Sequence, residues 1–170
     1  MQPRVSIIMG STSDMPVMEA AAKFLGEMEI PFEINALSAH RTPELVATFA
    51  FEAAGRGVEV IIAAAGGAAH LPGVIAASTT LPVIGVPIRS ANSVNGMDSL
   101  LSIVQMPAGI PVATVAIDGA YNAAVLACQI LATADATLRG RLAAFKTSLA
   151  AKIAKANDDL AAVTMPFKVR

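Results

Sequence analysis

Short apolar runs alternate with helical patterns along the first 132 residues of the chain. Runs of strand length cover residues 5–9, 32–37, 58–65, 81–87 and 112–117. Between and after them, at 17–28, 43–53, 71–77, 98–105 and 120–132, the sequence favours helices, several with apolar positions at helical spacing. Near-continuous apolar strands separated by helices are typical of a parallel sheet covered on both faces. The pattern predicts a doubly wound three-layer α/β/α sandwich with a five-stranded, flavodoxin-like sheet.

The C-terminal part of the chain carries a different pattern. Its apolar positions follow one helical stripe at spacings of three and four: Leu138, Leu142, Phe145, Leu149, Ile153, Ala156 and Leu160. We expect one domain over 1–170, with an α/β core at 1–133 and a long helix at 134–163. Because the sheet is complete before this helix begins, its apolar face needs a partner. The helix either caps its own domain or packs on a neighbouring subunit.

Composition favours packing of this helix on a neighbouring subunit. The chain has 170 residues, of which 55% are hydrophobic and 15% charged, with a net charge of −1. The absence of a basic field argues against nucleic acid as a partner. No uninterrupted apolar run reaches the roughly 18 residues that a membrane span needs. We therefore expect a homo-oligomer that buries much apolar surface between subunits. The N-terminus does not resemble a signal peptide and Cys128 is the only cysteine, so we expect a cytoplasmic protein.

The loop after the first predicted strand is small and rich in hydroxyl groups. It reads Gly-Ser-Thr-Ser-Asp over residues 10–14 and leads into a helix, whose free N–H groups favour an anion. Ser11 and Ser13 supply hydroxyls in this loop. Asp14 has two equally weighted interpretations, a helix cap or an acceptor for sugar hydroxyls. The loop matches neither of the usual glycine-rich nucleotide-binding motifs.

The loops after the second and third predicted strands each contain one of the two histidines. His40 stands beside Arg41, which combines a proton carrier with a forked donor for phosphate or carboxylate. The alternative is a solvated arginine and a helix-capping histidine. His70 follows Gly66 and Gly67, which allow close approach of a ligand. It either contacts substrate or orders its loop. Neither metal-ligand spacing nor a nucleophile elbow is present.

Six short motifs together are similar to the PurE family, class I N5-carboxyaminoimidazole ribonucleotide mutases. They occupy residues 9–14, 38–43, 65–73, 85–87, 95–100 and 102–107, in the order of the family. The resemblance implies an isomerase of de novo purine biosynthesis that moves a carboxylate from the exocyclic N5 to ring C4 of its ribonucleotide substrate. It implies no metal, ATP or organic cofactor. It also implies a homo-octamer whose C-terminal helices pack on neighbouring subunits.

The same resemblance assigns roles to residues by position. His40 matches the general acid/base, and His70 matches a residue that shapes the pocket. Asp14 is suited to the ribose hydroxyls, Ser38 and Arg41 match the phosphate side, and the backbone of Gly66 matches the position beside the migrating carboxylate. The full set of matching substrate-binding positions is Ser11, Ser13, Asp14, Ser38, Arg41, Ala65, Gly66 and His70. Two rival hypotheses stay open: a class II-type carboxylase that uses carbon dioxide directly, and a non-catalytic protein that binds a phosphoribosyl ligand.

Overall fold

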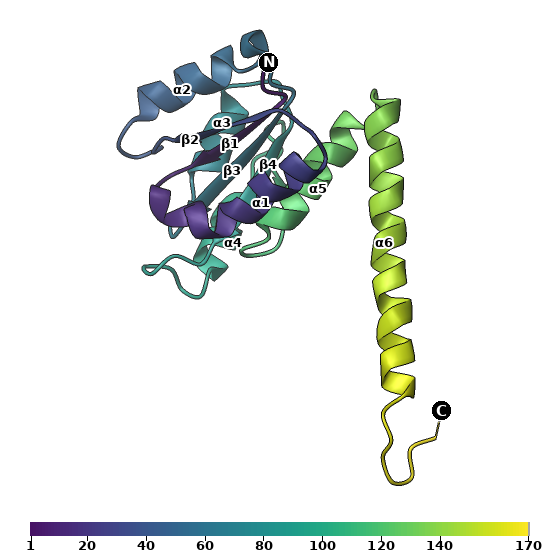
Figure 1. Ribbon diagram of the computed structural model, residues 1–170. Helices are drawn as coiled ribbons and strands as arrows, with labels where there is room; N and C mark the ends of the chain where they lie inside the picture. Colours follow the sequence, from purple (N-terminus) through teal and green to yellow (C-terminus); the bar gives the residue numbers. More distant parts are fainter. Residues whose placement is uncertain (170) are drawn as a thin grey trace.

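The computed structural model describes residues 1–169 and contains one parallel sheet in the order β2-β1-β3-β4-β5 (Figure 1). The strands are β1 (Val5–Met9), β2 (Phe32–Ala36), β3 (Val60–Gly66), β4 (Val83–Ile88) and β5 (Ala113–Thr114). Every paired strand runs parallel to its neighbour. This strand order is that of a flavodoxin-like sheet, and it confirms the predicted fold class.

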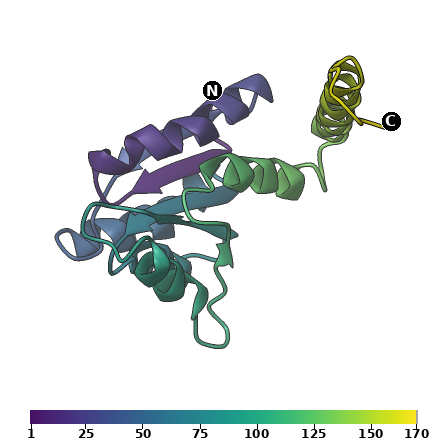
Figure 2. The same ribbon diagram turned by 90° about the horizontal axis from the view of Figure 1, so that it is seen from below.

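Helices cover both faces of the sheet, as the near-continuous apolar strands require (Figures 1 and 2). The helices of the α/β core are α1 (Met15–Glu27), α2 (Pro43–Glu52), α3 (Leu71–Ala77), α4 (Met97–Val104) and α5 (Ala120–Leu131). One apolar cluster joins the sheet to α1 and α5, and a second joins its other face to α2, α3 and α4. Short 3-10 turns precede α1 (Thr12–Asp14) and follow α2 (Ala54–Arg56).

Strand β5 is shorter than the sequence predicts. The apolar run covers 112–117, but only Ala113–Thr114 form the strand. The N–H of Val115 still donates to the carbonyl of Gly85 at 3.1 Å. The next donor of β4 would be Pro87, which has no N–H, so the ladder cannot continue. Asp118, whose φ is +56°, still donates its N–H to the carbonyl of Pro87 at 2.8 Å, outside the regular register of the strand.

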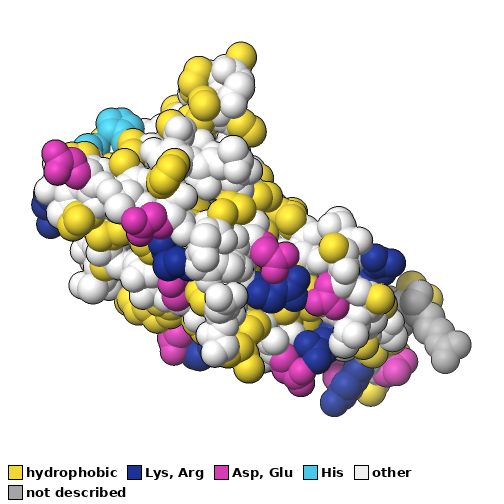
Figure 3. Space-filling model, turned by 90° about the horizontal axis from the view of Figure 1, so that it is seen from above, with side chains coloured by type: hydrophobic (Ala, Val, Ile, Leu, Met, Phe, Trp, Pro, Cys, Tyr) yellow, Lys and Arg dark blue, Asp and Glu magenta, His cyan; other side chains and the backbone are white. Residues whose placement is uncertain are grey.

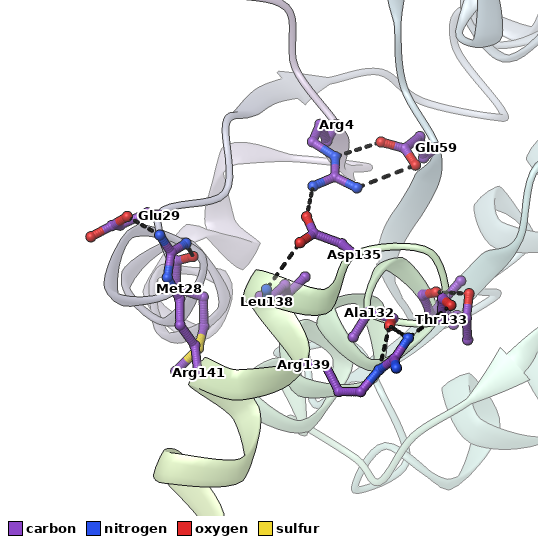
Figure 4. A network of polar contacts seen from close by, with 11 residues as sticks. Arg4, Met28, Glu29, Glu59, Ala132, Thr133, Asp135, Leu138, Arg139 and Arg141 are labelled. Atoms are coloured by element: carbon purple, nitrogen blue, oxygen red, sulfur yellow. Dashed lines mark hydrogen bonds and ion pairs between the residues drawn. The ribbon is translucent and has the colours of Figure 1, made fainter.

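The long C-terminal helix α6 (Ala136–Ala161) begins against the core and then leaves it (Figures 1 and 2). Asp135 caps its first turn, accepting hydrogen bonds from the N–H of Leu138 at 3.0 Å and from Arg4 Nη1 at 2.8 Å (Figure 4). Leu138 is buried, while Leu142 and Phe145 pack on the cluster beneath α1 and α5.

Arg141 gives α6 a second polar attachment to the core. Its guanidinium donates to the carbonyl of Met28 at 2.8 Å and pairs with Glu29 (Figure 4). Beyond this region the stripe is uncovered, because Leu149, Ile153 and Leu160 are exposed. The part of the chain that the structure describes contains no helix with the length and apolarity needed to cross a membrane.

Candidate active site

One cavity of about 350 Å³ collects the loops that follow β1, β2 and β3. These loops lie at the carboxyl edge of the sheet, where β1 and β3 are neighbours and the chain switches from one face to the other. Ligands of doubly wound proteins bind at this switch point. The lining contains every site residue predicted from the sequence: Ser11, Ser13, Asp14, Ser38, His40, Arg41, Ala65, Gly66 and His70.

The two histidines contact each other inside this lining. Nε2 of His40 lies 2.8 Å from Nδ1 of His70, and the rings are nearly perpendicular at 87°. Figure 3 shows the pair on the surface at one end of the molecule. Within residues 1–169 neither ring makes another hydrogen bond, so Nδ1 of His40 and Nε2 of His70 are available to a ligand. A hydrogen bond across this contact requires one of the two ring nitrogens to donate and the other to accept.

A tight turn at the end of β2 places His40 and Arg41 at the cavity. The N–H of Thr42 donates to the carbonyl of Ser38 at 2.8 Å, and Thr42 Oγ1 donates to the same carbonyl at 3.0 Å. The guanidinium of Arg41 reaches across to the carbonyl of Gly10 at 3.1 Å and to Ser38 Oγ at 3.3 Å. Arg41 therefore joins the loops after β1 and β2, with donors left for an anion.

Asp14 is a buried carboxyl group in the cavity wall, with 4% of its surface exposed. It stands at the N-cap position of α1, but its side chain makes no capping hydrogen bond. Oδ1 instead accepts a hydrogen bond from Ser13 Oγ at 3.2 Å. Burial raises the pKa of Asp14, and the Ser13 hydroxyl opposes part of that rise. Of the two interpretations left by the sequence, the helix-capping hydrogen bond is not formed by this side chain.

Two further polar residues of the lining, Ser90 and Asn92, are absent from the prediction. They belong to the loop between β4 and α4, which ends at the same edge of the sheet as the other three loops. The position of this loop after a buried strand was the signal that could have found them. No recognisable motif distinguishes Ser90 or Asn92 from the other polar residues of the segment 89–96.

Two other features of residues 1–169 bear on the location of the site. A second hollow, of about 420 Å³, lies beside the end of α6, and its lining contains no histidine or acidic side chain. The same part of the chain contains no group of three or more His, Cys, Asp or Glu side chains that could hold a metal ion. Both histidines line the cavity at the switch point, which makes it the candidate site for acid–base chemistry.

The fold and the site define a flavodoxin-like α/β protein with a polar ligand site at its switch point. More particularly, the chain belongs to the AIR carboxylase family, whose profile matches residues 4–152. It is 57% identical over 159 residues to N5-carboxyaminoimidazole ribonucleotide mutase of Mycobacterium tuberculosis, covering 94% of this chain and 91% of that relative. The mutase of Pyrococcus horikoshii is 58% identical over 152 residues, with 89% and 85% covered.

The fold of the chain is also similar to that of a solved relative. The crystal structure of Treponema denticola PurE has a TM-score of 0.82 and 30% sequence identity, and the match covers 94% of this chain and 99% of that one. The resemblance to the PurE family inferred from the sequence motifs is thereby confirmed.

Proposed function

We propose that the chain is an N5-carboxyaminoimidazole ribonucleotide mutase of de novo purine biosynthesis, with His40 as its general acid/base. The product is 4-carboxy-5-aminoimidazole ribonucleotide. The relatives that match almost the whole chain bear this activity in their names. The observation that carries the proposal is that His40, in contact with His70, lines one cavity with Arg41 and Asp14. His40 can carry a proton, Arg41 can donate hydrogen bonds to an anion, and Asp14 can accept hydrogen bonds from hydroxyl groups. A ribonucleotide isomerase needs all three kinds of group.

His40 acts in both halves of the proposed reaction. It first protonates the N5 side of the carbamate, the N–C bond breaks, and carbon dioxide is released beside the ring. Ring C4 then attacks the trapped carbon dioxide, and His40 takes the proton that C4 loses. The carbon dioxide lost from N5 is regained at C4, so the reaction balances without metal, ATP or an organic cofactor. Histidine suits this reversal because it both gives and accepts a proton near neutral pH.

The remaining lining residues hold the substrate in this proposal. Arg41 and Ser38 bind the 5′-phosphate, and Asp14, with Ser11 and Ser13 beside it, binds the ribose hydroxyls. The migrating carboxylate lies against Ala65 and Gly66 at the end of β3. Alanine methyl groups on this side limit the water that competes for released carbon dioxide. His70 positions the ring of His40 through the 2.8 Å contact.

We also propose that the enzyme is a cytoplasmic homo-octamer in which the outer half of α6 packs on neighbouring subunits. The exposed side chains of Leu149, Ile153 and Leu160 support this assembly, because an isolated helix gains little by presenting three large apolar residues to water. In this assembly each chain is one domain, with an α/β core at residues 1–133 and an intersubunit helix at residues 134–163.

A parallel assay of two substrates tests the proposed activity. One arm supplies N5-carboxyaminoimidazole ribonucleotide, and the other supplies aminoimidazole ribonucleotide with bicarbonate as the source of carbon dioxide. We expect rapid product formation in the first arm and little in the second at equal enzyme concentration. Preference for the second arm would identify a class II-type carboxylase. Ligand binding without turnover in either arm would identify a binding protein.

A further inference from the structure

The loop between β4 and α4 places a fixed amide group at the end of β3. Ser90 Oγ donates a hydrogen bond to Asn92 Oδ1 at 2.7 Å. Because this bond occupies the oxygen end of the amide, the Nδ2 end is directed elsewhere. A Cβ added at Gly67 would lie 3.2 Å from Nδ2, so the donor end lies against the backbone of that glycine. Within residues 1–169, Nδ2 donates no hydrogen bond of its own.

Ser90, which donates to this amide, is held by packing on Gly66 and by hydrogen bonds within its own loop. A Cβ added at Gly66 would lie 2.4 Å from Ser90 Oγ and 3.2 Å from the carbonyl oxygen of Ile88, so the loop packs directly on the glycine backbone. The carbonyl of Ser90 also accepts from Ser93 Oγ at 2.8 Å and from the Ser93 N–H at 3.0 Å. The loop therefore presents the Ser90–Asn92 pair to the cavity from a folded turn.

The charges of the cavity explain why such a donor is needed. The proposed substrate has two anionic groups, a phosphate and a carboxylate. Arg41 is the single Lys or Arg among the lining residues that this chain contributes within 1–169. One guanidinium cannot serve both groups at opposite ends of a ribonucleotide. A neutral donor also suits the chemistry better, because the carboxylate must become uncharged carbon dioxide and a cation would stabilise the charged ground state.

We propose that Asn92 recognises the migrating carboxylate through its Nδ2 amide and that Ser90 orients it. This inference rests on the proposed mutase function. Nδ2 lies against Gly67, the residue after Gly66, which the proposed function places beside the migrating carboxylate. Ser90 is a positioning residue, whereas Asn92 contacts substrate and discriminates between carboxylated and decarboxylated ribonucleotides.

Binding measurements on the full chain test this assignment. The ratio of Kd values for aminoimidazole ribonucleotide and 4-carboxy-5-aminoimidazole ribonucleotide measures how strongly the protein prefers the carboxylate. We expect Asn92→Ala to reduce this preference roughly tenfold, the usual effect of losing a hydrogen bond to a charged group. Asn92→Asp should reduce it further, because a second carboxylate repels the first. Ser90→Ala should have a smaller effect in the same direction.

A matched variant and the wild type make the result decisive. Asn122→Asp introduces the same chemical change on α5, outside the lining of the cavity, and should keep the wild-type ratio. A wild-type ratio in folded Asn92→Ala and Asn92→Asp would overturn the assignment of Asn92. Failure of the wild type to bind the carboxylated ribonucleotide would instead overturn the proposed function. Circular dichroism of each variant establishes that the fold is retained.

Discussion

His40 and His70 are 30 residues apart in the chain, yet their Nε2 and Nδ1 atoms lie 2.8 Å apart. The contact results from the fold, because β1 lies between β2 and β3 and both following loops turn towards the same edge. A hydrogen bond across this contact links the tautomers of the two rings, because one nitrogen must donate and the other must accept. The proposed role of His40 as acid/base therefore depends on how His70 holds its ring.

Replacing His40 tests its role as the proton carrier. We expect His40→Asn to bind the ribonucleotide but to lose isomerisation by about 10²–10⁴-fold, because asparagine keeps a polar group of similar size and cannot exchange a proton. Single-turnover kinetics with a separate Kd measurement distinguish the two effects.

The companion variant His70→Asn should keep part of the rate and leave the Kd for the ribonucleotide nearly unchanged, because His70 acts through the ring of His40. Wild-type turnover in His40→Asn would contradict the assignment of the acid/base. A wild-type rate in His70→Asn would show that the contact between the rings is not used in catalysis.

Arg41 is expected to bind the phosphate. Arg41→Ala should weaken binding of the 5′-phosphorylated ligand roughly 10- to 100-fold, the range for losing hydrogen bonds between charged groups. Binding of the dephosphorylated nucleoside should change little. Titration calorimetry with both ligands measures the difference. Arg89→Ala removes an exposed arginine from the same edge of the sheet but outside the cavity lining, and it serves as the control. Equal losses for both ligands would exclude phosphate recognition by Arg41.

Asp14 couples the site to the stability of the free protein. Burial raises the pKa of its carboxyl group in the folded chain, so the folded state binds a proton more strongly than the unfolded state. This contribution to the free energy of unfolding is complete below the unfolded pKa, about 4, and is lost as the pH rises through the raised folded value. Asp14→Asn removes the buried charge, so we expect a higher melting temperature at pH 7 and a smaller difference near pH 4.

The same substitution should weaken binding of the ribose, because an amide nitrogen replaces one carboxylate acceptor. Thermal melts across this pH range, with and without ribonucleotide, measure both effects. Asp159→Asn changes an exposed carboxylate on α6 and should leave both unaltered. A lower melting temperature for Asp14→Asn at pH 7 would show that the carboxylate stabilises the free fold.

The fold and the position of the main site could be predicted because both depend on the order of apolar strands and polar loops along the sequence. Apolar strands require a covered parallel sheet, and the loops after parallel strands meet at one edge, so His40, Arg41 and His70 could be grouped before the structure was known. The direct contact between the histidines could not be predicted, because it depends on side-chain rotamers. Asn92 was missed because no motif marks it within the segment 89–96, and its hydrogen bond with Ser90 depends on side-chain rotamers.

Packing on its own domain, the first alternative for the C-terminal stripe, holds for the inner part of the helix, and packing of the outer part on a neighbouring subunit stays a prediction. Leu138 is buried, and Leu142 and Phe145 pack on the core of their own chain, whereas Leu149 and Ile153 lie beyond that contact and are exposed. Periodicity alone shows that a helix has an apolar face. It does not show where the core ends along that face, because the direction of α6 depends on its attachment at Asp135.

The outer half of α6 should determine the assembly of the protein. We expect Leu149→Glu combined with Ile153→Glu to give a smaller or an aggregating species in light scattering. A smaller species would result because charges are costly to bury in an interface. Aggregation would result because the apolar surface that the interface normally covers becomes exposed. The inner part of α6 keeps its contacts with the core in this variant. Ending the chain near Thr133 is a harsher test, since it also removes Leu138.

A control double variant shows whether the position of the added charge on α6, and not only its amount, changes the assembly. Ala151→Glu combined with Ala154→Glu adds the same charge on the opposite side of the helix, away from the apolar stripe, and should leave the wild-type particle size. Soluble particles of wild-type size in the Leu149 and Ile153 variant would refute an intersubunit role for this surface. Activity measured on the same samples then shows whether the site needs the assembly, because the cavity lies in a part of the chain that neither pair of substitutions alters.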